Sequence, residues 1–118
     1  DHPGALLNLG NLLFAGEEIR AAHGLYLRAT QASPDYADAW YNLANAWDEL
    51  GSRDAAAHAY ERALELAPEF SDAHFNLALL WEKEGARDRA RPHWRLYLKL
   101  DAHSPSAEIA RQFLLADD

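Results

Sequence analysis

The chain repeats itself with a period of 34 residues, and this period constrains the fold more than any other feature of the sequence. When the sequence is shifted by 34, residues 38–71 align with residues 72–105 with 12 identities in 34 positions. Segments of this composition would share about two or three identities by chance. The same shift brings residues 4–37 into register. A fixed period of this length predicts three stacked copies of one supersecondary unit.

Within residues 38–71, the apolar residues recur with the spacing of a helix pair. Gly51 is expected to end the first helix, because glycine tolerates a left-handed backbone. Asp54 is placed to cap the second helix, and Pro68 closes the unit because proline cannot continue a helix. The first helix has an apolar stripe at i, i+3, i+4 and i+7, made of Trp40, Leu43, Ala44 and Trp47.

The period and these positions resemble the tetratricopeptide repeat. The first unit departs from the family pattern in its loop, where Glu17 takes the usual glycine position. The third unit has His74 for a large apolar residue, Tyr97 for a small one and Ala102 for the proline. The resemblance implies an all-α fold, a right-handed α-α superhelix of three helix-turn-helix repeats. The middle unit matches the whole family pattern, with Trp40, Leu43, Ala44, Trp47, Ala56, Tyr60, Ala63 and Pro68.

The two ends of the repeat array differ. Ser104 followed by Pro105 is an N-cap and first-turn pair, so one more helix is predicted to cap the third unit. At the other end, Leu6, Leu9 and Leu13 are expected to pack mainly within the first unit. Its open side would join preceding repeats of a longer protein or self-associate. The predicted architecture is a single domain, 1–118, with repeats 4–37, 38–71 and 72–105 and a capping helix 105–116.

Composition and motifs exclude several classes of function. With 19 acidic and 11 basic residues, the formal charge of −8 argues against a nucleic-acid-binding surface. No apolar run is long enough to span a membrane, and no leader opens the chain. The chain has no cysteine, no phosphate-binding loop and no catalytic motif. Its histidines show no paired spacing, and His74 is expected in a partly buried packing position. We therefore predict no enzyme activity, no cofactor and no metal site.

The remaining candidate is a surface, because the first helices of such repeats line a concave groove that in this family binds peptides or helices. An asparagine side chain both donates and accepts, so it can bind a peptide backbone without reading its sequence. Asn11 and Asn45 favour partner contact, because Leu79 replaces them in the third unit. Asn42 and Asn76 are either scaffold or contact residues. The predicted groove residues are Leu7, Asn8, Asn11, Asp38, Tyr41, Asn42, Asn45, Asp48, Glu49, Asp72, Phe75, Asn76, Leu79, Glu82 and Lys83.

These residues predict a protein–protein interaction scaffold whose partner has apolar or basic groups. Family members that grip a peptide's C-terminal carboxylate use cations at positions that here hold Leu7, Asp72 and Asn76, so that mode is disfavoured. The alternatives are a regulatory or substrate-recruiting arm of an enzyme or transcription regulator, and a self-assembling structural module. A second surface is a basic stripe that is either a solvated helix face or a docking site for an acidic partner: Arg87, Arg91, Arg95 and Lys99.

Overall fold

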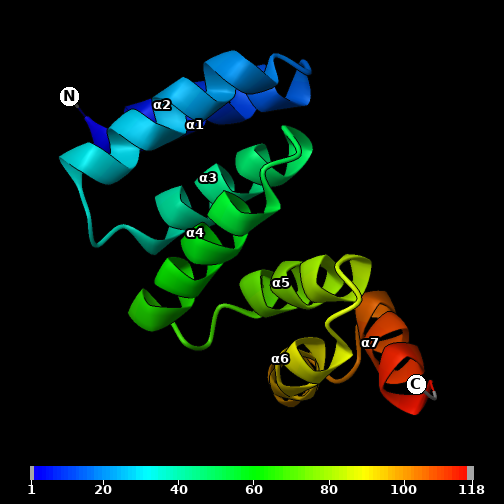
Figure 1. Cartoon of the computed structure of the whole chain (residues 1–118). Coiled ribbons are helices and arrows are strands. Elements are labelled where there is room, and N and C mark those ends of the chain that lie inside the picture. The colour runs from blue at the N-terminus through cyan, green and yellow to red at the C-terminus, as the bar shows by residue number, and fades with distance from the viewer. Residues whose placement is uncertain (1, 117–118) are drawn as a thin grey trace. The chain divides into compact units, whose positions relative to one another are not determined.

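The computed structural model describes residues 2–116, so Asp1, Asp117 and Asp118 of the predicted domain lie outside the described residues. These residues form seven α-helices and contain no strand (Figure 1). The chain divides into two compact units, Asp1–Pro68 and Glu69–Asp118. The helices are α1 (Pro3–Ala15), α2 (Ile19–Ala32), α3 (Ala37–Glu49), α4 (Arg53–Leu66), α5 (Ser71–Lys83), α6 (Arg87–Leu100) and α7 (Pro105–Leu115).

The first unit contains two helix pairs, α1 with α2 and α3 with α4, and α2 also packs against α3. Small residues allow the paired helices to approach closely, since Ala44 and Ala56 are completely buried. Tyr26 and Tyr60 are each 1% exposed and fill the space beside them. The apolar stripes that the 34-residue period defines therefore face the interior of this unit. Its core cluster is Leu6, Leu7, Ala22, Tyr26, Ala29, Ala39, Leu43 and Ala46.

A short turn joins the two helices of each of the three pairs, and each turn has one residue with a positive φ at the same repeat position. Gly51 and Gly85 have φ of 84° and 74°, in the left-handed region that glycine tolerates. Glu17 has φ of 63° at the equivalent position, so the first turn adopts the same conformation at a steric cost. The prediction for Asp54 was wrong, because α4 begins at Arg53 and Asp54 lies within its first turn. There its charge still interacts favourably with the helix dipole.

The second unit is organised around Trp94, which is completely buried on α6. The Phe75 ring meets it edge-on with centroids 5.1 Å apart, and the Phe113 ring stacks on it at 4.9 Å. Phe113 lies on α7, so this stack fixes the last helix onto the α5–α6 pair. Pro92 lies inside α6, which remains helical through residue 100. His74 is 4% exposed, a more complete burial than the partly buried position predicted from sequence.

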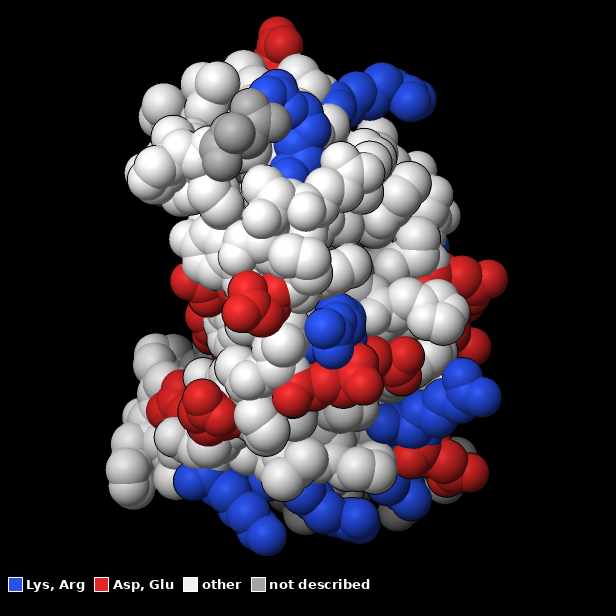
Figure 2. Space-filling model, turned by 90° about the vertical axis from the view of Figure 1, so that its left-hand side faces the viewer, with Lys and Arg blue, Asp and Glu red and all other residues white. Residues whose placement is uncertain are grey.

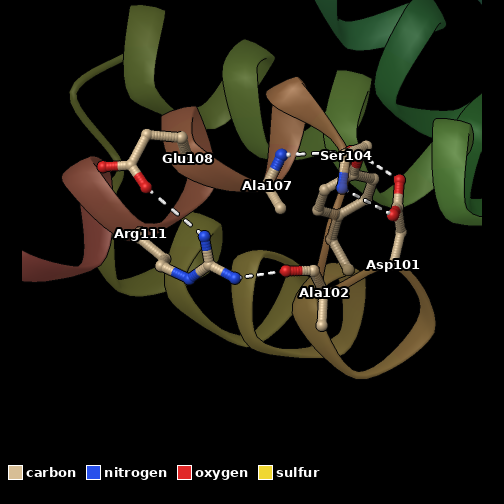
Figure 3. Close-up of polar contacts among 7 residues, drawn as sticks. Asp101, Ala102, Ser104, Ala107, Glu108 and Arg111 are labelled. Carbon is tan, nitrogen blue, oxygen red and sulfur yellow. Dashed lines mark hydrogen bonds and ion pairs between the residues drawn. The ribbon is translucent and has the colours of Figure 1, made fainter.

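The turn from α6 to α7 is held by a polar network (Figure 3). The Ser104 hydroxyl accepts a hydrogen bond from the Ala107 N–H at 3.2 Å, which is the predicted N-cap. Asp101 accepts from the Ser104 N–H and from the Tyr97 hydroxyl, at 3.3 and 2.8 Å. Hydrogen bonds from Ser104 and then Tyr97 lower the pKa of Asp101. Arg111 donates to the Ala102 carbonyl and so ties α7 to the turn itself.

The first helix is less covered than its equivalents in the later repeats. Leu9 is 49% exposed, so it is not a core residue, whereas Leu43 at the same repeat position is 2% exposed. The difference arises because α2 packs on α3, while α1 is the first helix of the described residues.

Within residues 2–116, no helix has the length and apolar character needed to cross a bilayer.

Candidate partner-binding surface

The predicted groove residues of the first unit lie on α1 and α3, which contact each other. Asn8, Asn11 and Glu49 are exposed. Leu7 is the exception: it is 6% exposed and belongs to the core, so it cannot contribute to a surface in this structure. Asp38 is also exposed, and the other members of the predicted set on α3 are half-buried: Tyr41, Asn42, Asn45 and Asp48.

Two of these asparagines have a role inside the repeat that the sequence analysis did not anticipate. The Tyr26 hydroxyl donates a hydrogen bond to Asn11 Oδ1 at 2.7 Å, which links α1 to α2. The Tyr60 hydroxyl donates to Asn45 Oδ1 in the same way and links α3 to α4. Burial raises the pKa of Tyr26 to about 12, because the tyrosinate would lose its hydration. Each asparagine therefore satisfies a buried hydroxyl across its helix pair.

In the third helix pair, different residues make the hydrogen bond that links the two helices. Its equivalent positions hold Leu79 and Trp94, and the Trp94 indole N–H donates to Glu82 Oε2 at 3.0 Å. The Glu82 carboxylate also lies 3.5 Å from Arg87 Nε. The sequence contained a signal for this arrangement, because the position that holds Asn11 and Asn45 is asparagine only where the facing position on the second helix is tyrosine. The change to Leu79 thus accompanies the change to Trp94.

In the first unit, the neighbouring helices α1 and α3 differ in charge. Helix α1 has no charged residue along its whole length. Helix α3 carries Asp38, Asp48 and Glu49 and has no basic residue. Figure 2 shows one face of the molecule, on which Asp and Glu side chains gather beside some of the Lys and Arg side chains, while other Lys and Arg side chains lie apart from them. An apolar-to-acidic surface suits a partner with apolar and basic groups.

In the second unit, two of the repeat positions predicted to line a groove have equivalents on α7, which the sequence predicted only as a cap. Phe75 and Asn76 are half-buried, Leu79 is packed against the core cluster, and Lys83 is exposed. Extending the 34-residue shift once more would have found two α7 equivalents, Ile109 for Phe75 and Phe113 for Leu79. Ile109 is 47% exposed. A hollow of about 460 Å³ lies here, lined by Glu108, Ile109, Gln112, Phe113 and Ala116.

The basic stripe on α6 is shorter than the sequence suggested. Arg87 donates to the carbonyls of Phe113 and Ala116, both at 3.1 Å, and so holds the last turn of α7. Arg95 and Lys99 are exposed. The guanidinium of Arg87 therefore belongs to the scaffold, and what remains of the stripe is two exposed cations and the half-buried Arg91.

The structure pairs two histidines that lie 19 residues apart. His74 Nδ1 and His93 Nδ1 are 3.0 Å apart, so one ring must donate and the other accept. Burial, and then the neighbouring His74, lowers the pKa of His93 to about 4. Among residues 2–116, no cluster of three or more His, Asp or Glu side chains is placed to hold a metal ion.

Comparisons with known proteins agree with this helix-pair architecture. The family model for the tetratricopeptide repeat matches residues 37–70. The Arabidopsis OM64 TPR domain superposes with a TM-score of 0.89 at 20% identity, covering 95% of this chain and 93% of that one. Residues 37–70 therefore form a tetratricopeptide repeat, and the chain as a whole has the fold of a tetratricopeptide repeat domain. Its fold is the all-α, α-α superhelical solenoid that the sequence predicted.

Two other solved structures are similar to this repeat domain. The first TPR of Spaghetti (RPAP3), bound to the HSP90 peptide SRMEEVD, has a TM-score of 0.88 at 18% identity and covers 95% of this chain and 90% of its own. A crystal structure of MamA has 32% identity and a TM-score of 0.80 over 85% of this chain. This domain spans 58% of that MamA chain. No curated protein sequence matches significantly. The fold and these neighbours support a protein-interaction scaffold.

Proposed function

We propose that this domain binds a peptide segment or helix that presents both apolar and basic side chains to the first helices of its repeats. The observation that carries the proposal is the pairing of α1 and α3: an uncharged helix lies against one with three acidic residues and no basic residue. Tyr41 supplies a half-buried aromatic anchor on α3. Aromatic anchors beside complementary charge are typical of binding hot spots.

The charge of the partner is the point on which the proposal differs from the peptide-bound relative. The first TPR of Spaghetti is bound to SRMEEVD, a peptide with three acidic residues and one basic residue. In this chain, the positions that would grip a C-terminal carboxylate hold Leu7, Asp72 and Asn76, of which Leu7 is buried. An acidic peptide would meet Asp48 and Glu49 with like charge, which costs affinity. The favoured ligand is therefore basic.

The test uses a pair of fluorescent peptides of about twelve residues, one built from Lys and Leu and a twin with Glu in place of each Lys. Fluorescence anisotropy should show binding of the basic peptide only, with an affinity that falls as salt is raised. The double variant Asp48→Asn with Glu49→Gln should weaken binding by roughly tenfold. The matched control is Glu61→Gln with Glu65→Gln, two exposed acids on α4.

Tyr41→Ala tests the apolar part of the site and should weaken binding of the same peptide by about tenfold or more. The Tyr41 and Tyr60 rings lie 6.0 Å apart, so the melting temperature must be measured alongside. Asn45→Ala is not a clean test, because it would strip the Tyr60 hydroxyl of its acceptor. Equal binding of the acidic twin, or equal losses in the α4 control, would contradict the proposal.

A further inference from the structure

One face of α6 combines exposed leucines with exposed cations. Leu96 and Leu100 are 41% and 43% exposed, and Arg95 and Lys99 beside them are exposed as well. We call these four residues the α6 face. They lie on one side of the helix because neighbours in the set are three or four residues apart. Among residues 2–116, no carboxylate pairs with Arg95 or Lys99.

The same positions are exposed on α2, although further helices follow it. Helices α3 and α4 belong to the same compact unit as α2 and leave the side of α2 that carries these positions uncovered. A helix pair that followed α6 in the same way would therefore leave the α6 face uncovered too. All four positions are exposed on α2, where they hold Leu27, Arg28, Gln31 and Ala32.

The composition of the α6 face differs from that of an ordinary solvated helix face. On α4, the positions of Arg95 and Lys99 hold glutamates, and the arginine at the position of Leu96 lies 3.8 Å from one of them. The charges of α4 thus compensate each other within the helix. Helix α6 carries five of the 11 Lys and Arg residues of the chain and a single acid, Asp88. The α6 face is therefore a local basic and apolar surface on a chain of formal charge −8.

Charge and shape together indicate what this face receives. Its cations match carboxylates, and its leucines match apolar side chains. The face is a ridge on a helix rather than a groove or a sheet edge, and such a ridge packs against another helix. An anionic membrane is a poorer match, because lipid recognition typically uses about 4–8 clustered cations, and the formal charge of −8 opposes approach to that surface.

We propose that the α6 face docks an acidic amphipathic helix of a partner protein, with leucines of the partner on Leu96 and Leu100 and its carboxylates on Arg95 and Lys99. One helix ridge buries less than the roughly 1,200 Å² of a standard interface, so the complex is weak and reversible. The α6 face lies in the second compact unit and takes the opposite charge from the groove of α1 and α3. It therefore does not rest on the peptide-binding proposal.

The probe is a labelled peptide of about 24 residues, designed as a helix with leucines on one face and glutamates along both edges. Its neutral twin has glutamine for each glutamate. Fluorescence anisotropy should show saturable binding of the acidic helix that weakens with salt, and at least about tenfold weaker binding of the neutral twin. The acidic peptide of about twelve residues used for the groove should not bind, because isolated helices below about 12–15 residues are marginal.

Charge reversal tests the basic part of the face. Arg95→Glu with Lys99→Glu should weaken binding of the acidic helix at least about tenfold. The matched control is Arg20→Glu with Arg28→Glu, which changes the net charge equally at two exposed cations of α2. Melting temperatures of both variants show whether the fold is retained. Equal losses in the two variants would overturn the proposal, because binding would then follow the net charge alone.

The leucines are tested separately. Leu96→Gln should weaken binding of the acidic helix about fivefold or more, because it removes apolar contact area from the centre of the face. Leu27→Gln, at a leucine that is 38% exposed on α2, should leave binding unchanged. Equal binding by Leu96→Gln and the wild type would overturn the apolar part of the contact.

The remaining outcomes separate this face from the groove and from a lipid surface. Asp48→Asn with Glu49→Gln should bind the acidic helix as the wild type does, and a loss of binding in this variant would place the helix in the groove and overturn the proposal. No binding of the acidic helix by the wild type would overturn it too. Retention of the wild type by phosphatidylserine vesicles would in that case assign the α6 face to a lipid surface.

Discussion

The third helix pair differs from the first two in how it satisfies its buried polar groups, although all three share one backbone plan. In the first two pairs, a buried tyrosine donates to an asparagine on the partner helix. In the third, Leu79 and Trp94 occupy those positions, and the indole N–H of Trp94 donates to Glu82 instead. The fold thus requires a polar link across each pair, because an orphaned buried donor is costly. It does not require a particular residue.

A second difference concerns another pair of positions on the same two helices. Leu6 and Leu25 in the first pair are replaced in the third by His74 and His93, whose ring nitrogens are 3.0 Å apart. Two apolar side chains of the first pair are therefore replaced by two titratable side chains in the third. This comparison predicts that the third pair responds to mutation and to pH in ways that the first two do not.

The largest expected effect is the loss of Trp94, the centre of the second unit. Trp94→Ala should lower the free energy of unfolding by about 3–5 kcal/mol, because it leaves a cavity between Phe75 and Phe113 and removes the indole donor to Glu82. Urea denaturation followed by circular dichroism measures the change. Leu96→Ala is the control on the same helix, since Leu96 is 41% exposed. A loss below about 1 kcal/mol would mean that the stack on Phe113 does not hold α7.

Exchanging the polar links between pairs is the sharpest test of the comparison. Asn45→Leu alone should cost about 1–3 kcal/mol, because the Tyr60 hydroxyl loses its acceptor while buried. Adding Tyr60→Trp and Asp48→Glu rebuilds the set that the third pair uses at the same positions. The combined variant should recover about 0.5–3 kcal/mol relative to the sum of its parts. Simple additivity of the three changes in urea denaturation would show that the residues of each set do not act together.

The histidine pair predicts acid sensitivity. The pKa of His93 is about 4 in the folded state and 6.5 ordinarily, so below pH 6.5 protons bind preferentially to the unfolded chain. Stability should therefore fall as the pH is lowered from 6.5 towards 4, by about 1–2 kcal/mol once the partial exposure of His93 is allowed for. Thermal melts across this range measure the loss. His93→Gln should make the profile shallower, with a remaining slope that includes His23, whose pKa is also lowered by burial. His58→Gln, on the exposed face of α4, is the matched control and should leave the profile as it is in the wild type.

The smallest predicted effect separates the first turn from the other two. Glu17→Gly should raise the free energy of unfolding by about 0.5–1 kcal/mol, because it relieves a left-handed backbone at a residue with a side chain. Gly51→Ala, at the equivalent position, should have the opposite effect of similar size. Differential scanning calorimetry resolves changes of this magnitude. A destabilised Glu17→Gly variant would indicate a favourable contact of the Glu17 side chain.

Much of the fold could be predicted from the period and from a few residue types. The family resemblance, the superhelical fold and the left-handed backbone at Gly51 are confirmed. Ser104 caps α7 as expected. These features succeed because they depend on local spacing and backbone conformation. The prediction of Asp54 as a cap was wrong, because α4 begins at Arg53, two residues earlier than an N-cap at Asp54 requires.

The polar contacts across helix pairs were harder to predict. Asn11 and Asn45 were interpreted as partner contacts, and the tyrosines that they bind lie 15 residues away on another helix. The His74–His93 pair and the bonds from Arg87 to the end of α7 span 19 to 29 residues. Such contacts depend on how side chains meet across a packed interface, which periodicity does not specify. The burial of Leu7 could not be predicted from the period either, because Tyr41 and Phe75 at the same repeat position are only half-buried.

The burial of Tyr26 has a consequence at the opposite end of the pH scale. Burial raises its pKa from 10 to about 12 in the folded state, so above pH 10 the hydroxyl loses its proton more readily in the unfolded chain. Stability should therefore decline between pH 10 and 12 through the first helix pair, just as acid acts through the third. Alkali would thus destabilise the first helix pair through Tyr26, whereas the titration of His93 destabilises the third pair in acid.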